Sequence, residues 1–124
     1  MPLLVNPDNF KKEVLRCKLP VLVDFFGERC APCLLLRPIL LELGEDFAGR
    51  LKICMFNTDR EHRDTDEAYE KKFQILGEYD VRHLPTLLLF SGGKPRRTAV
   101  GLQTKEELLD ILGEEGLTPA PAAL

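Results

Sequence analysis

The chain has 124 residues, of which 44% are hydrophobic and 30% are charged, and this length and composition are those of one globular domain. Its net charge of −3 provides none of the basic surface with which proteins bind nucleic acids or anionic membranes. No apolar run approaches the ~18 residues of a membrane span, and Met1–Phe10 lacks the basic and long apolar segments of a secretory signal, so we expect a cytoplasmic protein.

The first part of the chain predicts a helix followed by a buried strand. Asn6–Asp8 is a typical helix start, because asparagine caps a first turn and proline is tolerated there. This helix is expected to end before Pro20, which cannot donate a backbone hydrogen bond. Val21–Phe26 then predicts a buried strand, since it is apolar throughout except for Asp24.

A second helix is predicted from about Pro32 to about Phe47. Pro38 is expected to kink it and Gly49 to stop it. Its inward-facing stripe is predicted from apolar residues at three- and four-residue steps: Leu35, Leu36, Ile39, Leu40 and Leu43. The apolar run Leu51–Phe56 predicts the next strand.

The segment Arg60–Gln74 is highly charged and predicts a helix that begins near Asp64. We interpret Arg60–Lys72 as a solvated helix face, with a partner-specific docking surface as the alternative. The apolar residues available for its inner side are Ala68, Tyr69, Phe73 and Ile75.

The last part of the chain predicts a hairpin and a helix. Leu87–Phe90 is a strong strand that ends in the turn cluster Ser91–Lys94, and Thr98–Val100 is its hairpin partner. Thr104 is expected to cap a final helix, and residues 116–124 are expected to form a disordered tail after a domain that spans residues 1–115. The order of elements predicts an α/β protein with a mixed central sheet and helices on both faces.

Two cysteines separated by two residues, Cys30 and Cys33, lie between the buried strand and the second helix. In this setting such a pair indicates thiol–disulfide redox chemistry. A helix N-terminus favours the thiolate over the thiol, and the thiolate is the nucleophile. The alternative is a structural or zinc-binding pair, but Cys17 and Cys54 do not form the second pair that zinc requires, and we interpret them as packing residues.

These motifs together resemble the thioredoxin family over about residues 5–112. The matching segments are Val21–Phe26, Cys30–Cys33, Pro38, Asn57–Asp59, Leu84–Phe90 and Gly101. The resemblance implies the thioredoxin fold, no dissociable cofactor and no metal. The chain departs from the family at Arg29, where thioredoxins usually carry tryptophan, and at Ala31, where they carry glycine. It also has a longer segment between Asp59 and Val81.

The resemblance implies the catalytic roles. Cys30 attacks a substrate disulfide, Cys33 resolves the mixed disulfide, and Asp24 accepts the Cys33 proton. Many thioredoxins place a lysine near this aspartate, but the matching position here is Met55. We therefore expect a buried Asp24 with an unusually high pKa; the alternative is an exposed aspartate at a strand edge.

The resemblance also implies a substrate-binding surface around the cysteine pair. Pro85 resembles the family's cis-proline, next to which the backbone of Leu84 pairs with an extended substrate. Gly101 resembles the loop glycine beside it. Arg29, Ala31 and Pro32 surround Cys30 in the sequence and are predicted to contact substrate. His83 is predicted to contact substrate or to perturb Cys30, and the alternative is that it does neither.

We therefore predict a protein-disulfide reductase whose partners are disulfide-containing substrate proteins. A thioredoxin reductase is expected to regenerate the dithiol, and a monomer is expected because it is the usual state of this fold. One alternative is a disulfide oxidase or isomerase, which shares the same residues at a higher redox potential. The other is a non-catalytic binding module that retains the fold.

Overall fold

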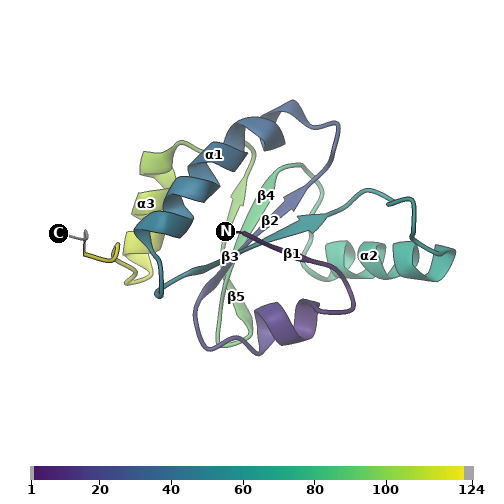
Figure 1. The fold of residues 1–124 in the computed structure, drawn as a ribbon, viewed down its shortest axis with the longest axis horizontal. Helices are drawn as coiled ribbons and strands as arrows, with labels where there is room; N and C mark the ends of the chain where they lie inside the picture. The colour runs from purple at the N-terminus through teal and green to yellow at the C-terminus, as the bar shows by residue number, and fades with distance from the viewer. Residues whose placement is uncertain (1, 122–124) are drawn as a thin grey trace.

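The computed structural model describes residues 2–121, which contain one five-stranded sheet (Figure 1). The strands are β1 (Leu3–Val5), β2 (Val21–Phe26), β3 (Lys52–Asn57), β4 (Thr86–Ser91) and β5 (Lys94–Val100). Their order in the sheet is β1-β3-β2-β4-β5. β1, β3 and β2 are parallel, whereas β4 pairs antiparallel with β2 and with β5. The predicted mixed sheet is therefore confirmed.

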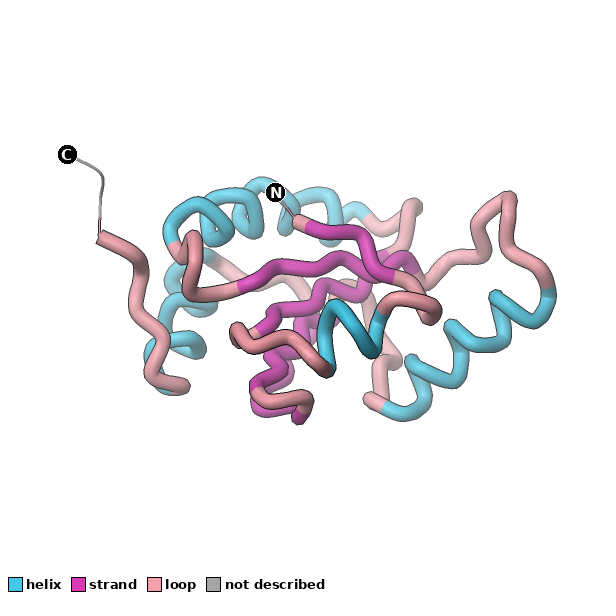
Figure 2. The backbone as a smooth tube through the Cα atoms, turned by 60° about the horizontal axis from the view of Figure 1, so that its bottom comes forward, coloured by secondary structure: helices cyan, strands magenta, loops and turns pink. Residues whose placement is uncertain are grey.

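Helices cover both faces of this sheet (Figure 2). In the described part of the chain they are η1 (Lys11–Leu15), α1 (Ala31–Asp46), α2 (Asp66–Glu78) and α3 (Lys105–Glu114). Side chains of α1 and α3 share one buried cluster with the sheet. Side chains of η1 and the end of α2 pack into a second cluster on the opposite face. The arrangement is the layered α/β architecture expected from the sequence.

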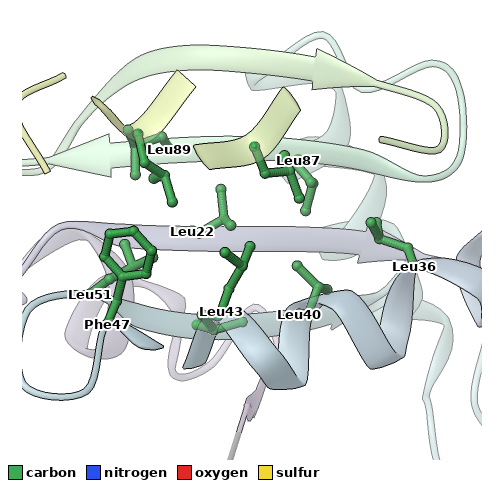
Figure 3. Packing of buried hydrophobic residues seen from close by; sticks show 11 residues of the cluster. Leu22, Leu36, Leu40, Leu43, Phe47, Leu51, Leu87 and Leu89 are labelled. Atoms are coloured by element: carbon green, nitrogen blue, oxygen red, sulfur yellow. The ribbon is translucent and has the colours of Figure 1, made fainter. Parts of the chain in front are cut away.

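The α1 face of the sheet is filled mainly by leucines (Figure 3). Leu22 of β2 lies in this cluster with the buried residues Leu36, Leu40 and Leu43 of α1, which confirms most of the predicted stripe. Leu35 is 62% exposed, so its place in the stripe is wrong. The buried position at the start of α1 belongs instead to Cys33, three residues before Leu36.

β1 was not predicted from the sequence. Its three residues pair in parallel with β3, and Leu4 lies opposite Met55. Only Val5 of β1 is buried, while Leu3 and Leu4 are 40% and 67% exposed. A three-residue edge strand with one buried side chain is too short to show the alternation that identifies a strand.

The first predicted helix is shorter than expected. The Asn6 side chain accepts hydrogen bonds from the backbone N–H groups of Asp8 and Asn9, at 2.8 and 3.2 Å. Asn6 therefore caps a turn before the helix. The helix itself is only η1, a single stretch of π-helix whose N-cap is Phe10 without a side-chain hydrogen bond, so the prediction that Asn6 caps it is wrong. α1 in contrast continues without interruption through Pro38, and Gly49 adopts a φ of +79° in the turn after it.

α2 has an unusual inner side. Thr65 caps it by accepting a hydrogen bond from the Ala68 N–H at 3.1 Å, which confirms the predicted helix start. Among the described residues of α2 only Lys72 is buried, while Phe73 is 57% exposed. The prediction that Phe73 faces inward is therefore wrong, and the interpretation of Lys72 as part of a solvated face is wrong as well.

The C-terminal part agrees with the predicted hairpin and helix. β4 and β5 form the hairpin, and Thr104 caps α3 in a capping box with Glu107. β5 is an edge strand that begins with Lys94-Pro95-Arg96-Arg97. Part of the predicted tail, residues 122–124, lies outside the described residues. Within the described part, the Ala120 N–H donates to the carbonyl of Asp46 at 2.7 Å. No helix of the described chain has the length and apolar character required to cross a membrane.

Candidate functional site

Cys30 and Cys33 meet at the N-terminus of α1, where they form a disulfide. Cys30 is the N-cap residue, and the Cys33 N–H donates to Cys30 Sγ at 3.3 Å. Pro32 fits the first turn because the N–H that it lacks has no partner within the helix there. Cys33 is 1% exposed, whereas Cys30 is partly exposed. Of the two sulfur-bearing residues, Cys30 is therefore the one that a large substrate can reach.

Asp24 lies on β2, on the face of the sheet that α1 covers. Its side chain is completely buried, and neither carboxylate oxygen has a hydrogen-bond partner among the described residues. Burial raises the pKa of Asp24 to about 7, and the positive charge of Arg37 opposes part of this increase. The expectation of a buried aspartate with a high pKa is confirmed, and the alternative of an exposed one is wrong.

The segment before β4 lies beside the loop that carries Cys30. The Leu84–Pro85 peptide bond is cis, as the resemblance implied. A Cβ atom at Gly27 would lie 3.0 Å from Leu84 Cδ1, so the loop after β2 contacts the Leu84 side chain. The Gly101 N–H donates to the Pro85 carbonyl at 2.7 Å, which places the loop after β5 at the same end of the sheet.

Several predicted substrate-contact residues are on the surface. Arg29, Ala31 and Pro32 are exposed beside Cys30, and Leu84 is 36% exposed. The His83 side chain is also exposed, while its backbone carbonyl accepts a hydrogen bond from the Thr86 hydroxyl at 2.6 Å. These positions are compatible with substrate contact, and their roles remain predictions.

A hydrogen-bonded network that sequence reasoning missed holds the loop before Cys30. The Glu28 N–H donates to the Asp59 carboxylate at 2.7 Å, and Asn57 Nδ2 donates to the Glu28 carboxylate at 3.1 Å. The Asp59 N–H in turn donates to Asn57 Oδ1 at 2.9 Å. Asn57 and Asp59 belong to a segment that resembles the family, and this was the only signal that could have identified them.

Lys72 anchors the same network from α2. Its ammonium group donates to the Asp59 carbonyl at 2.7 Å and forms ion pairs with Glu61 and Asp64 at 3.1 and 2.9 Å. The loop between β3 and α2, which is part of the longer segment of this chain, is thereby connected to the loop that carries Cys30. Three acceptors around one ammonium also explain why a lysine can be buried at this position.

The two remaining cysteines lie on the opposite face of the sheet. Cys54 is fully buried in the cluster on the η1 side, and Cys17 packs against that cluster. Burial raises the pKa of the Cys54 thiol to about 11, so it stays protonated. This position confirms the packing interpretation. Within residues 2–121, no group of three or more histidine, cysteine, aspartate or glutamate side chains is arranged to hold a metal ion.

Comparison with known proteins decides the family. A model of the family described as Thioredoxin matches residues 1–114. The chain belongs to the thioredoxin family. A thioredoxin of Rickettsia felis is 41% identical over 110 residues, which are 89% of this chain and 94% of the relative. A thioredoxin of Rickettsia conorii is 42% identical with the same coverage. A thioredoxin of Acidithiobacillus ferridurans is 39% identical over 91% of this chain and 94% of its own.

Family membership and the Cys30–Cys33 pair together define the activity. The protein is a thiol–disulfide oxidoreductase of the thioredoxin family, and it reduces disulfides in proteins. The reaction needs a nucleophilic thiolate and a second thiol within reach of it, and the N-terminus of α1 supplies both. The predicted family, fold and enzyme class are therefore confirmed.

Proposed function

We propose that the two cysteines act in sequence, with Cys30 as the nucleophile and Cys33 as the resolving thiol. The Cys30 thiolate forms a bond to one sulfur of a substrate disulfide, and the other substrate sulfur leaves as a thiolate. Cys33 then loses its proton, and its sulfur attacks Cys30 Sγ. The Cys30–Cys33 disulfide forms, the second substrate sulfur leaves, and two electrons have passed to the substrate. The difference in exposure between Cys30 and Cys33 carries this assignment.

Asp24 is the proposed acceptor of the Cys33 proton. It lies on the face of the sheet covered by the helix that carries Cys33, and its pKa of about 7 suits a group that exchanges protons near neutral pH. The carboxylate oxygens are not engaged by any hydrogen-bond donor in residues 2–121. A base whose lone pairs are unoccupied can accept a proton without first breaking another bond.

The proposed substrate surface combines three loops around Cys30. It comprises Arg29, Ala31, Pro32, His83, Leu84, Pro85 and Gly101. An extended substrate segment would pair with the backbone at Leu84, which is the mode of recognition known as β-augmentation. The contact between Gly27 and Leu84 and the hydrogen bond from Gly101 to Pro85 support this grouping, because they bring the loops together.

The cellular location, oligomeric state and electron donor are proposed from the family. We propose a cytoplasmic monomer, with its domain over residues 1–115, whose dithiol is regenerated by a thioredoxin reductase. The thioredoxin relatives favour a reductase over the two alternatives, a disulfide oxidase or isomerase of higher potential and a non-catalytic binding module. The disulfide at an accessible helix N-terminus favours a catalyst over a binding module.

Trapping experiments test the order of the two cysteines. The Cys33→Ser variant should accumulate a mixed disulfide with a substrate such as insulin, whereas Cys30→Ser should form none. The opposite pattern would reverse the two assignments. The redox potential of the wild-type protein tests the direction: a value near ~−270 mV supports a reductase, and a value near ~−120 mV supports the oxidase.

A further inference from the structure

The described residues contain three buried side-chain polar atoms without a hydrogen-bond partner. Two are the carboxylate oxygens of Asp24, and the third is Nε of Arg37. A buried polar atom without a partner is rare and costly, and here all such atoms belong to two side chains of opposite charge. This coincidence suggests that the two side chains act on each other.

The sheet itself offers no charge to Asp24. Residues opposite one another across the strands form a row that runs from β1 to β5: Leu4, Met55, Asp24, Leu87 and Ala99. Asp24 is the only polar member of this row. The residues directly opposite Asp24 on the neighbouring strands therefore provide no cation for the carboxylate.

α1 supplies that cation. Cys33 and Arg37 are four residues apart on α1, so they lie one turn apart on the same side of the helix. The Arg37 guanidinium lies over the ring of Phe26, 5.5 Å from its centroid. Phe26 is two residues beyond Asp24 on β2 and therefore points to the same face, where it clusters with Cys33 and Met55. Arg37 is thus placed beside both Asp24 and Cys33.

Arg37 also lines a groove of about 550 Å³. Phe26 and Met55 form part of the wall, Leu34 and Leu41 of α1 form another part, and Glu28 lies at its edge. Arg37 therefore has a buried Nε without a partner and at the same time lines a groove open to the surface. An arginine suits this position because it keeps its charge even where it is partly buried.

We propose that Arg37 is a positioning residue of the resolving step, whose guanidinium stabilises the ionised form of Asp24, the form that can accept the Cys33 proton. The inference rests on the proposed role of Asp24. It assigns to a helix residue the stabilising charge that the sheet position Met55 does not provide. The opposing effect of Arg37 on the pKa of Asp24 agrees with this geometry.

The groups that face Asp24 are few. β3 contributes Met55 and β4 contributes Leu87, and neither side chain titrates. α1 contributes Arg37 and Cys33, and Glu28 reaches the same groove from the loop after β2. In the oxidised protein Cys33 does not titrate, because it is part of the disulfide. A titration of Asp24 in the oxidised protein therefore contains no contribution from the Cys33 thiol.

The test is a carboxyl ¹³C NMR titration of Asp24 in the oxidised protein, with and without Arg37→Met. We expect the pKa of Asp24 to rise by about one unit, as follows from the loss of a neighbouring opposite charge. Arg37→Lys should retain most of the wild-type value, and Met55→Lys should restore it in the Arg37→Met background. Arg16→Met, which removes an exposed arginine from the opposite side of the sheet, is the matched control and should have no effect.

Activity separates the inference from the proposal on which it rests. With Asp24 shifted by one unit, insulin reduction at pH 7 should fall about fivefold in Arg37→Met and recover at higher pH. An unchanged Asp24 titration in both Arg37→Met and Arg37→Gln would overturn the role of Arg37 while leaving that of Asp24 intact. A wild-type pH profile in Asp24→Asn would overturn both.

Discussion

The backbone N–H of Glu28 donates to the carboxylate of Asp59 across 2.7 Å, although the two residues are 31 positions apart in the chain. Glu28 is two residues before Cys30, and the carbonyl of the same Asp59 accepts from the buried Lys72 ammonium. A continuous set of hydrogen bonds thus runs from α2 to the loop before Cys30. The longer segment between Asp59 and Val81 therefore helps to hold the loop before Cys30 in place.

The first prediction concerns the bond between Asp59 and Glu28. Asp59→Ala removes a charged acceptor, and such a hydrogen bond contributes about 1.5–3 kcal/mol. We expect amide hydrogen exchange at Glu28 to become at least ~10-fold faster, since 1.4 kcal/mol corresponds to a factor of ten. Asp66→Ala is the control, because Asp66 is an exposed aspartate that pairs only with Arg60 among the described residues. Equal exchange rates in the two variants would show that the Asp59 carboxylate does not hold the Glu28 N–H.

The second prediction concerns the buried lysine. Lys72→Met removes the ammonium group from three acceptors and leaves the Asp59 carbonyl without its donor. We expect the free energy of unfolding, measured in urea, to fall by about 2 kcal/mol. Lys71→Met is the matched control, because Lys71 is exposed and, among residues 2–121, forms only a surface pair with Glu67 at 3.6 Å. Its effect should stay below about 0.5 kcal/mol. A similar loss in both variants would refute the special role of Lys72.

The third prediction follows from the raised pKa of Asp24. Its pKa is about 7 in the folded protein and near 3.8 when the chain is unfolded, so the folded state favours the neutral acid. The stability that this provides is complete below pH ~4 and is lost as the pH rises to ~7, by about 4 kcal/mol in total. In the oxidised Asp24→Asn variant, the free energy of unfolding in urea should not show this loss between pH 4 and pH 8. If the free energies of unfolding of the wild type and the variant differ by the same amount at pH 4 and at pH 8, Asp24 does not have a raised pKa in the folded protein.

The fourth prediction compares two adjacent glycines in the turn between β4 and β5. Gly92 and Gly93 both have positive φ, but only at Gly93 would a Cβ atom collide, 2.7 Å from the carbonyl oxygen of Leu15. Gly92→Ala should cost about 1 kcal/mol for the left-handed backbone alone. Gly93→Ala should cost about 3 kcal/mol, because the end of η1 must also move. Urea unfolding measures the free energy of unfolding of both variants. Equal losses of stability would show that the end of η1 moves away from the new Cβ atom at little cost.

Local signals account for the parts of the fold that the sequence predicted well. β2 has the predicted bounds because it is a run of residues that are apolar except for Asp24. α3 begins at Lys105, directly after the predicted cap Thr104, because a helix cap is a local motif. The burial of Asp24 followed from its place within that run. The position of Pro85 depended on resemblance, since nothing in its neighbours requires a cis bond.

Long-range packing accounts for the parts that could not be predicted. β1 is defined by its pairing with β3, and its own three residues carry little pattern. Lys72 is buried because the loop before α2 folds back with two carboxylates, an arrangement that helical periodicity cannot reveal. Arg37 acquires its place beside Asp24 only when α1 packs on β2. In each case the partner is distant in sequence or belongs to another element.

Unlike the surface proposed to bind substrate, the two edges of the sheet are poorly suited to pair with another strand. β5 begins with Lys94-Pro95-Arg96-Arg97, and a proline together with like charges on an exposed strand hinders the addition of another strand. β1, at the opposite edge, offers only three residues for pairing. Both edges of the sheet therefore resist the addition of further strands and the aggregation that it would start. The backbone pairing that we propose for a substrate is instead at Leu84, just before the inner strand β4.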